Sequence, residues 1–395
     1  MSTLAEDILD LFQKAIDVAS PNFMFRSFYK EHPEVVDSLQ KGTKNLYVFA
    51  LGKAAYCMGM SFSNHFPINR GFILTKYGHL PSKALISGED SIWKYREASH
   101  PIPDQNSISH SEEVLRDLIS LGENDCLVVL LSGGGSSLFE IPVDGISLDD
   151  LIRIQNDLLR SGKPIQEINK ERKKYSQVKG GKLLQHLNPR LEVFTFVISD
   201  VLGDDPATIA SGPTFPSQNY YILGNLTRSI QKIKQEAERL GYRTKLISDT
   251  WDKTSEETSL LIEKEFLSAL ESEQRQIILL GGEMVCPVLG NGVGGRNQET
   301  ALRVAILLNQ HQSDRQWCFL SGGTDGTDGP TDAAGGIVTH HSFRRMLAKG
   351  WDPKKELENS NSYPVLKSVD SLVMTGPTGT NVNDILILLV EGTKS

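Results

Sequence analysis

The sequence predicts an α/β protein of two domains whose sheets are mostly parallel. Short apolar runs alternate with amphipathic helical stretches along the chain, and this alternation is typical of α/β layers. The runs are continuously apolar, as expected for strands that helices cover on both faces. A length of 395 residues gives two or three domains at about 150 residues each.

The elements follow from these patterns in chain order. The opening segment predicts a packed helix, because its apolar residues fall on one helical face. These residues are Ile8, Leu11, Phe12, Ala15 and Ile16. The expected strands are Leu46–Leu51, Gly71–Thr75, Cys126–Leu131, Val193–Ser199, Thr244–Ser248, Ile277–Leu280, Trp317–Leu320 and Ile385–Val390. The expected helices between them include Ser111–Leu121, Leu148–Ser161, Ser229–Leu240 and Asn297–Gln310. A boundary after the helix that ends at Leu240 divides the chain into domains 1–240 and 241–395.

The composition excludes several classes of protein. The 41 basic and 49 acidic residues give a net charge of −8, so a nucleic-acid or membrane-surface binder, which needs a basic footprint, is not expected. The longest apolar runs, Cys126–Leu131 and Ile385–Val390, are far shorter than the roughly 20 residues that span a bilayer. The N-terminus is acidic, so no signal peptide is expected. The four cysteines contain no C-x-x-C pair, which favours reduced thiols in a cytoplasmic protein.

A serine-glycine loop follows the expected strand Cys126–Leu131. It reads Ser132-Gly133-Gly134-Gly135-Ser136-Ser137. Three glycines let several backbone N–H groups point at one anion, and the serine hydroxyls add donors. The loop therefore predicts a phosphate site, with a tight strand-to-helix turn as the alternative.

A lysine at the end of the first expected strand is a second candidate. Lys53 follows Leu46–Leu51 and Gly52 and opens a helical run. A lysine in this position can meet a phosphate at a helix start, although a lone lysine there is more often a solvated charge.

A run of aspartates follows the expected strand Trp317–Leu320. Asp325, Asp328 and Asp332 are separated by glycine-rich spacers that let the chain fold tightly. Asp325 and Asp328 are candidate ligands of a Mg²⁺ ion that also binds phosphate oxygens. The alternative is a pair of Asp-Gly turns with solvated side chains.

Two further strand ends carry charged residues. Asp200 lies at the end of Val193–Ser199, where a carboxylate could bind a metal or orient a hydroxyl. Glu283 follows the strand Ile277–Leu280, and Arg296 with Asn297 opens a later helix. The guanidinium of Arg296 could form a fork onto a carboxylate or a phosphate.

A glycine pattern in the same region fits G-x-G-x-x-G at Gly290, Gly292 and Gly295. A dinucleotide fingerprint needs a strand directly before it and an acid ending the next strand. Cys286-Pro287 interrupts the preceding run, and no such acid follows. The pattern therefore favours close backbone approach over nicotinamide binding.

Two remaining residues have open interpretations. His100 lies between prolines, where a structural turn and a role at a site are both plausible. Lys179 leads into Gly180-Gly181, which permits close approach of a ligand, while the basic residues before it fit a solvated helix face.

Together these motifs, in this order, resemble the type II glycerate kinase family, whose C-terminal module is the MOFRL domain. The resemblance covers roughly residues 5–390. It is carried by Leu51–Ala55, His100–Asp104, Ser132–Ser137, Arg172-Lys173, Lys179–Gly181, Ser199–Asp205, Ala210–Thr214, Gly281–Glu283, Gly294–Glu299, Gly323–Gly336 and Thr375–Asp384. The sequence departs from the family pattern at Ser99, where Gly is frequent, and at Tyr175, where the family has Leu.

The resemblance implies a larger Rossmann-like three-layer domain and a smaller C-terminal MOFRL domain, with the active site in the cleft between them. It implies phosphorylation of D-glycerate to 2-phosphoglycerate with ATP and Mg²⁺, although nothing in the residues distinguishes the 2-hydroxyl from the 3-hydroxyl. The family's key lysine and arginine map onto Lys53 and Arg296. The residues then expected to act in catalysis are Lys53, Arg296 and Asp200. Those expected to bind ATP are Ser132, Gly133, Gly134, Gly135, Ser136, Ser137, Lys179 and Glu283. Asp325 and Asp328 are expected to bind the metal, and the substrate is expected to contact Arg296, His100 and Asn297.

Two other functions stay open on the sequence alone. An NAD(P)H-dependent hydroxypyruvate reductase, a label that the family sometimes carries, would need a ribose-binding acid that the sequence does not offer. A non-catalytic sugar-phosphate-binding module would use the serine-glycine loop but would not need the repeated aspartates. The expected partners are small molecules, with no nucleic acid and no membrane, and a homodimer is left open.

Overall fold

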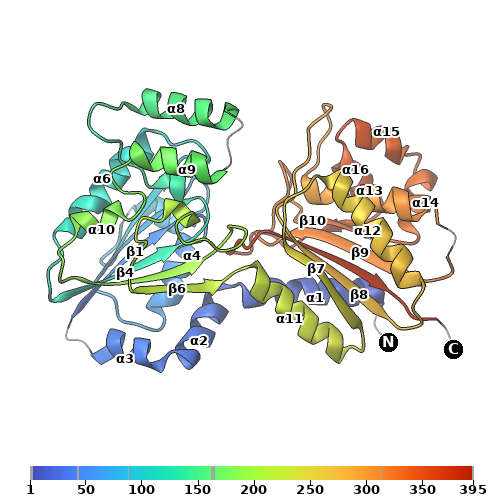
Figure 1. Ribbon diagram of the computed structural model, residues 1–395, viewed down its shortest axis with the longest axis horizontal. Helices are drawn as coiled ribbons and strands as arrows, with labels where there is room; N and C mark the ends of the chain where they lie inside the picture. Colours follow the sequence, from blue (N-terminus) through green and yellow to red (C-terminus); the bar gives the residue numbers. More distant parts are fainter. Residues whose placement is uncertain (1–2, 42–43, 88, 162–164, 312, 394–395) are drawn as a thin grey trace. The chain divides into compact units, whose positions relative to one another are not determined.

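The computed structural model describes residues 3–41, 44–87, 89–161, 165–311 and 313–393, which divide into two compact units (Figure 1). Unit 1 consists of Met1–Ser20, Leu226–Thr378 and Val382–Ser395, and unit 2 consists of Pro21–Asn225 and Gly379–Asn381. Helix α1 (Leu4–Val18) lies in unit 1 because it packs on α11 (Leu226–Arg239), where Ser229 Oγ donates a hydrogen bond to the carbonyl of Ala15. This division differs from the expected single boundary at residue 240.

Unit 2 is a three-layer α/β unit with a fully parallel sheet. The strand order is β3-β2-β1-β4-β5-β6, which is the order of doubly wound nucleotide-binding folds. The strands are β1 (Asn45–Leu51), β2 (Arg70–Lys76), β3 (Trp93–Ala98), β4 (Asp125–Leu131), β5 (Glu192–Ile198) and β6 (Asn219–Gly224). The Rossmann-like architecture that the resemblance implied is therefore confirmed for this unit.

Helices cover both faces of the unit 2 sheet. One face carries α2 (Pro21–Glu31) and α4 (Ala55–Ser63), whose Phe25 and Phe62 rings contact each other and Phe196 of β5. The other face carries α6 (Gln105–Ile119) and α10 (Lys182–His186), which pack on Phe49, Leu51 and neighbouring strand residues. The remaining helices are α3 (Pro33–Lys41), α5 (Ser82–Ser87), α7 (Gly135–Leu138), α8 (Leu148–Arg160) and α9 (Ile165–Lys174).

Unit 1 has a six-stranded sheet of order β11-β10-β9-β12-β8-β7. Among the neighbouring strand pairs of this sheet, the parallel one is β7 (Arg243–Trp251) with β8 (Gln276–Gly282). The antiparallel strands are β9 (Trp317–Gly323), β10 (Gly335–Thr339), β11 (Leu372–Val373) and β12 (Asp384–Val390). The expectation of mostly parallel sheets is therefore wrong for unit 1. Its strands β8, β9 and β12 are buried along their length because helices cover both faces, and this pattern does not report strand direction.

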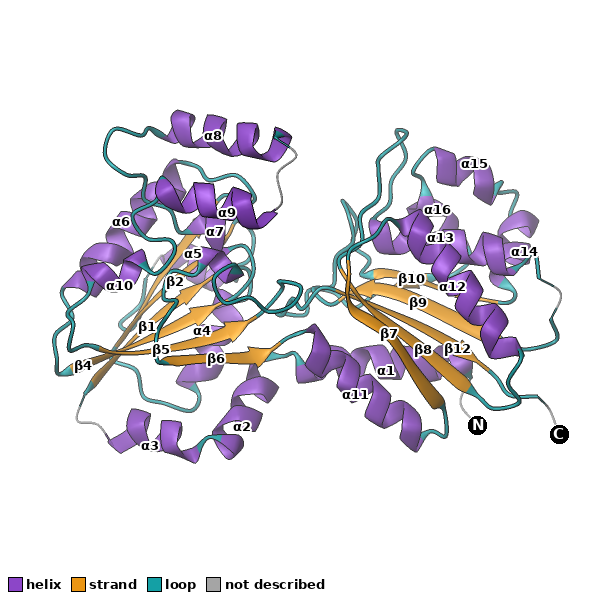
Figure 2. Cartoon of the chain, in the orientation of Figure 1, coloured by secondary structure: helices purple, strands orange, loops and turns teal. Residues whose placement is uncertain are grey.

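The helices of unit 1 also form two layers (Figure 2). Helices α1 and α11 cover one face, and Phe12 of α1 packs so closely on β9 that a Cβ at Gly322 would lie 2.7 Å from its Cζ. The other face carries α12 (Ser255–Leu270), α13 (Arg296–Leu308), α14 (Ser342–Ala348), α15 (Pro353–Glu358) and α16 (Ser362–Ser368). None of the helices in the described ranges has the length and apolar character of a membrane span.

Candidate active site

The carboxyl ends of three unit 2 strands bring candidate residues to one sheet edge. β1 and β4 are adjacent, and the chain runs outward from them in opposite directions to β3 and to β6. Such a switch in direction opens a crevice where doubly wound sheets bind ligands. Lys53 follows β1, the serine-glycine loop of residues 132–137 follows β4, and Asp200 follows β5.

The turn after β1 and the serine-glycine loop are fastened together. The Lys53 N–H donates to the Gly133 carbonyl at 2.8 Å. Ser132 Oγ accepts the Ala54 N–H at 3.0 Å and donates to the Leu51 carbonyl at 3.2 Å. Gly52 has φ +114°, and a Cβ there would lie 2.4 Å from the Ser132 carbonyl oxygen, so this close approach requires glycine.

Three predicted site side chains meet over the glycines of this loop. A Cβ at Gly133 would lie 1.7 Å from Asp200 Oδ2, so the carboxylate rests against the bare backbone. A Cβ at Gly134 would lie 3.1 Å from His100 Cδ2 and 3.3 Å from Lys53 Cγ. The glycines therefore give Lys53, His100 and Asp200 access to one stretch of backbone.

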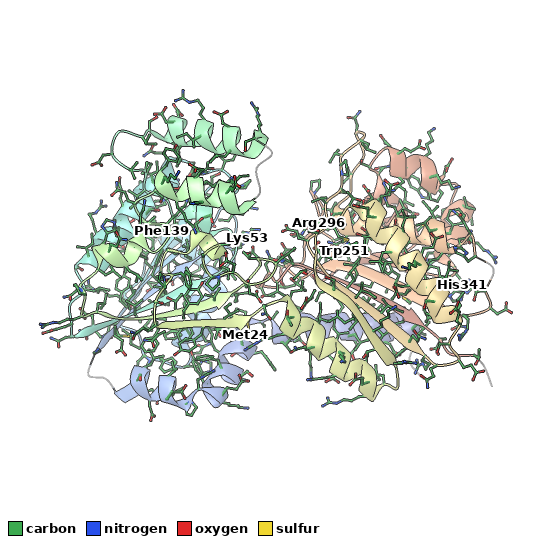
Figure 3. All side chains as sticks on the ribbon, in the orientation of Figure 1. Met24, Lys53, Phe139, Trp251, Arg296 and His341 are labelled. Carbon is green, nitrogen blue, oxygen red and sulfur yellow. The ribbon has the colours of Figure 1, made fainter. Side chains whose placement is uncertain are left out.

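The donors of this cluster are available to a ligand. No acceptor among the described residues takes the backbone N–H groups of Gly133, Gly134 or Gly135. The Lys53 ammonium, labelled in Figure 3, makes no ion pair with a described carboxylate within 4.0 Å. Adjacent N–H groups and a cation together form a suitable cradle for phosphate oxygens.

His100 is neutral in this setting. Burial lowers its pKa to about 4, and the positive charge of Lys53 acts in the same direction. A neutral imidazole can donate or accept a hydrogen bond, and it does not compete with Lys53 for an anion.

Gly135 and Ser136 of the loop lie against a strained turn. Ser136 Oγ lies 2.8 Å from Ser211 Oγ, and a Cβ at Gly135 would lie 2.7 Å from Ala210 Cβ. Ala210 and Ser211 both have positive φ, a costly backbone conformation that surrounding contacts must maintain. The Gly180 N–H donates to the Ser211 carbonyl at 2.9 Å and supports this turn.

Lys179 has a different position from the expected ATP contact. Its side chain is 2% exposed, and its ammonium forms an ion pair with the fully buried Glu140. Because Glu140 neutralises the buried ammonium of Lys179, this lysine has a structural role and does not present a cation to phosphate. The local Lys-Gly-Gly pattern gave no sign of Glu140, which is 39 residues away in the chain.

Unit 1 holds a second cluster at its own sheet edge, around Arg296 (Figure 3). Arg296 is the first residue of α13, and its guanidinium forms a fork on Asp384 with Nε–Oδ2 2.6 Å and Nη2–Oδ1 3.1 Å. Its Nη1 lies 3.3 Å from Oε1 of the exposed Glu283. Arg296 is thus held between two carboxylates, whereas its sequence context predicted direct contact with substrate.

Asp384 is a candidate site residue that the sequence motifs did not indicate. It is 1% exposed and begins β12, where it pairs in register with Gly282 at the end of β8 and Gly323 at the end of β9. Because β12 is antiparallel to both, its first residue reaches the edge where they end. A carboxylate that opens an apolar strand was the available signal.

Asn297 and Asp328 stabilise the start of α13. Asp328 is 3% exposed and accepts the N–H groups of Asn297 at 3.1 Å and Gln298 at 2.8 Å. Asn297 is 1% exposed, donates from Nδ2 to Asp384 at 3.0 Å and accepts from Ser321 at 2.6 Å. Their contacts are those of a helix cap and a positioning amide, and differ from the expected metal and substrate contacts.

Asp325 remains the accessible carboxylate of the aspartate run. Its Oδ1 accepts the Thr327 N–H at 3.1 Å. A Cβ at Gly323 would lie 3.3 Å from Asp325 Oδ1 and 3.5 Å from Asp384 Oδ1, so both carboxylates flank this glycine. In the described part of the chain, no group of three or more His, Cys, Asp or Glu side chains is arranged to hold a metal by itself.

The glycines of the G-x-G-x-x-G pattern serve packing. A Cβ at Gly290 would lie 2.4 Å from Asn359 Oδ1, one at Gly292 would lie 2.4 Å from Asn361 Cβ, and one at Gly295 would lie 2.3 Å from Asp328 Cγ. The loop before α13 is therefore pressed against residues 359–361 and Asp328, which accounts for its glycines without a dinucleotide.

Comparison with known proteins also divides the sequence into two parts, although the first part includes segments of α1 and α11, which belong to unit 1 in the structure. A family model described as a domain of unknown function (DUF4147) matches residues 7–237, and the MOFRL family model matches residues 276–384. A D-glycerate 2-kinase of Thermotoga maritima is 37% identical over 384 residues, covering 86% of this chain and 89% of that protein. A putative hydroxypyruvate reductase of Agrobacterium vitis is 34% identical over 81% of this chain and 92% of that protein.

A solved structure shares the whole fold. The crystal structure of glycerate kinase from Thermotoga maritima matches with a TM-score of 0.85 and 35% identity, over 98% of this chain and 99% of that one. Two family models in tandem, identity over most of the chain and a shared fold agree with one another. The chain belongs to the glycerate kinase family with a MOFRL C-terminal domain.

Proposed function

We propose that this protein transfers the terminal phosphoryl group of ATP to the 2-hydroxyl of D-glycerate with the help of Mg²⁺. The observation that carries the proposal is the cluster of Lys53, the glycine N–H groups and Asp200 at the switch point of the unit 2 sheet. Phosphoryl transfer depends on positioning and on neutralising charge, and these are the groups that supply both. The names of the relatives support glycerate as the acceptor.

In unit 2, each group has a proposed task. The Lys53 ammonium neutralises the oxygens of the transferred phosphoryl group, and the N–H groups of Gly133 and Gly134 orient them. Asp200, which the bare backbone of Gly133 accommodates, orients the acceptor hydroxyl as a hydrogen-bond acceptor. Neutral His100 contributes a hydrogen bond to the small acceptor molecule.

In unit 1, carboxylates predominate and suit a cation. Mg²⁺ in kinases is bound by one or two carboxylates together with phosphate oxygens and water. Asp325 and Asp384 flank Gly323 and fit this requirement. Glu283 is connected to Asp384 because both carboxylates contact Arg296. A bound Mg²⁺ would neutralise charge on the nucleotide phosphates. Arg296 holds Asp384 in a fixed orientation, and Asn297 does the same from the other side.

The competing function is the reductase named for one relative. The geometry does not favour it, because the glycines that could mark a dinucleotide site are used in packing against residues 359–361. A non-catalytic binding module is disfavoured because it would not require the carboxylate cluster of unit 1.

The deciding experiment measures both activities on the same preparation. The protein is incubated with D-glycerate, ATP and Mg²⁺, and ADP is followed with L-glycerate and no acceptor as controls. A parallel reaction contains hydroxypyruvate with NADH or NADPH. We expect ADP that depends on D-glycerate and no oxidation of either cofactor; the reverse pattern would reject the kinase.

Regiochemistry is tested on the product. In the ³¹P NMR spectrum, 2-phosphoglycerate couples to the single proton on C2, which gives a doublet. The phosphorus of 3-phosphoglycerate couples to the two protons on C3, which gives a triplet or a more complex pattern. A doublet is the expected result.

A further inference from the structure

Arg172 is a half-buried arginine that has neither a hydrogen-bond acceptor nor an ion-pair partner in the described part of the chain. It lies near the carboxyl end of α9, and its Nε is buried without any hydrogen-bond acceptor in the described part of the chain. Burial lowers the pKa of Arg172, and no acidic side chain offsets this effect. A buried N–H of a charged guanidinium that has no acceptor is unfavourable in a folded protein.

The other half-buried arginines of the described chain all have acceptors. Four bind a carboxylate, and one binds backbone carbonyls. These are Arg96 on Glu113 at 2.9 Å, Arg275 on Glu391 at 2.9 Å, Arg296 on Asp384 at 2.6 Å, Arg303 on Glu299 at 3.0 Å, and Arg315 on the carbonyl of Glu391 at 3.0 Å. The Nε of Arg275 is also buried without an acceptor, but its Nη2 binds Glu391. Arg172 differs from these five because none of its nitrogens has an acceptor in the described part of the chain.

The neighbouring cations do not compensate for this imbalance. Lys173 donates to the Ala207 carbonyl at 2.7 Å, and Lys182 donates to the carbonyls of Lys173 and Ser176. Asp205 is the acidic side chain that acts on Lys173. With Lys174 and its partner Glu171 included, four cations and two carboxylates leave this end of α9 with an excess of positive charge.

This basic end of α9 is connected to the serine-glycine loop. Lys173 fastens it to Ala207, which is in the same turn as Ala210 and Ser211. That turn contacts the loop through Ser211 and Ser136. The excess positive charge is thus attached to the turn that supports the expected phosphate cradle.

We propose that Arg172 binds an anionic oxygen group of a ligand, either the carboxylate of the acceptor or a phosphate of the nucleotide. The ligand that it would meet is the one in the proposed function, so this inference rests on that function for the identity of the anion. Arginine suits the role because its planar fork matches both carboxylate and phosphate oxygens. An anion in this position would supply the acceptor that the folded chain lacks.

The test compares Arg172→Met with Lys174→Met. Lys174 is exposed on the same helix and pairs only with Glu171 across one turn. Both proteins are unfolded thermally without ligand, and the dissociation constants of D-glycerate, ADP and inorganic phosphate are measured by calorimetry. Binding measured in this way does not depend on turnover, so a failed kinase assay would reject the proposed function and leave this inference to be judged separately.

We expect Arg172→Met to raise the melting temperature or leave it unchanged, because an unpaired buried charge is removed. We expect at least a tenfold weaker affinity for one of the anions, while Lys174→Met binds all three as the parent does. Selective loss of D-glycerate affinity identifies the carboxylate, and loss of ADP and phosphate affinity identifies the phosphate. Guanidinium chloride at low concentration should partly restore binding to Arg172→Ala.

Unchanged affinity for all three anions would overturn the proposal. A lower melting temperature without any loss of affinity would also overturn it, because that combination indicates a purely structural residue. A general loss of affinity that Lys174→Met shares equally would show a diffuse charge effect and would reject a specific anion contact.

Discussion

The two clusters differ in what already neutralises their cations. In unit 2, Lys53 lies beside free backbone N–H groups and makes no ion pair with a described carboxylate. In unit 1, Arg296 is held by a fork on Asp384 and approaches Glu283. An anion bound near Lys53 would therefore interact with an unpaired positive charge. An anion bound near Arg296 would have to compete with Asp384 and Glu283 for the guanidinium.

This difference indicates opposite chemical preferences. The unit 2 cluster combines N–H donors and a cation, which suit phosphate oxygens, with the single carboxylate of Asp200. The unit 1 cluster consists mainly of carboxylates, which suit a hard cation such as Mg²⁺. Substitutions in the two clusters should therefore change different kinetic quantities.

The largest effect is expected at Lys53. Lys53→Ala removes the cation that stabilises charge on the phosphoryl group, and loss of one such preorganised group typically lowers kcat by about 10²–10³. The melting temperature should stay near that of the parent, because Lys53 has no ion pair to lose. Steady-state kinetics and thermal unfolding check both points, with Lys174→Ala as the control. Near-normal kcat in Lys53→Ala would mean that the unit 2 cluster is not the phosphate site.

The second effect concerns the pH dependence of stability at Asp328. Burial raises the pKa of Asp328 in the folded protein to about 6, from its ordinary value of 3.8. Between about pH 4 and pH 6 the folded state retains a proton that the unfolded state has released, so the free energy of unfolding falls as pH rises through this window. Two pKa units correspond to roughly 3 kcal/mol.

Asp328→Asn should abolish that fall. Urea unfolding of both proteins between pH 4 and pH 7, in EDTA, measures it directly. Equal slopes in the two proteins would assign the dependence to other groups and would remove the argument that Asp328 is a buried helix cap.

A third effect is expected at Asp384. Asp384→Asn preserves shape but replaces a charged fork with neutral contacts, which costs about 1.5–3 kcal/mol for hydrogen bonds to charged groups. We expect lower stability together with lower kcat/KM, because Arg296 and Asn297 both lose their anchor. Arg296→Lys should show the same pattern, since one ammonium cannot reproduce the fork. Loss of activity without loss of stability would indicate that Arg296 is free to meet substrate.

How far the sequence predicts the fold depends on the unit. In unit 2 the central strands were predicted because they are continuously apolar, but β3 and β6 were missed. β3 reads Trp-Lys-Tyr-Arg-Glu-Ala, and an edge strand with half-exposed charges carries no apolar signal. In unit 1, strand direction could not be derived because antiparallel strands can be as buried and as apolar as parallel ones. The packing of α1 on unit 1 is a long-range contact that no local pattern reports.

The same reasoning explains which candidate site residues were predicted. The rule that the carboxyl ends of parallel strands share an edge predicted Lys53, Asp200 and Glu283 as candidates. It missed Asp384, which opens an antiparallel strand and reaches the edge from the opposite direction. Lys179 and Asp328 were predicted to contact ligands because the spacing of residues in the sequence reveals neither the burial of a side chain nor its long-range partners.

The smallest expected effect distinguishes the aspartates of unit 1. Asp325 flanks Gly323 together with Asp384, whereas Asp332 accepts a hydrogen bond from Tyr363 at 2.7 Å. If Asp325 is a Mg²⁺ ligand, Asp325→Asn removes one negative charge and keeps the shape, so the Mg²⁺ concentration for half-maximal activity should rise by about tenfold at most, given that phosphate oxygens and water supply the other ligands. Asp332→Asn is the matched control from the same run and should leave that concentration unchanged.

Titration of Mg²⁺ at fixed ATP and D-glycerate measures both variants, and excess Mg²⁺ should restore kcat in Asp325→Asn. An equal shift in both variants would indicate a general loss of negative charge, and no shift in Asp325→Asn would return this residue to the role of a turn-forming aspartate.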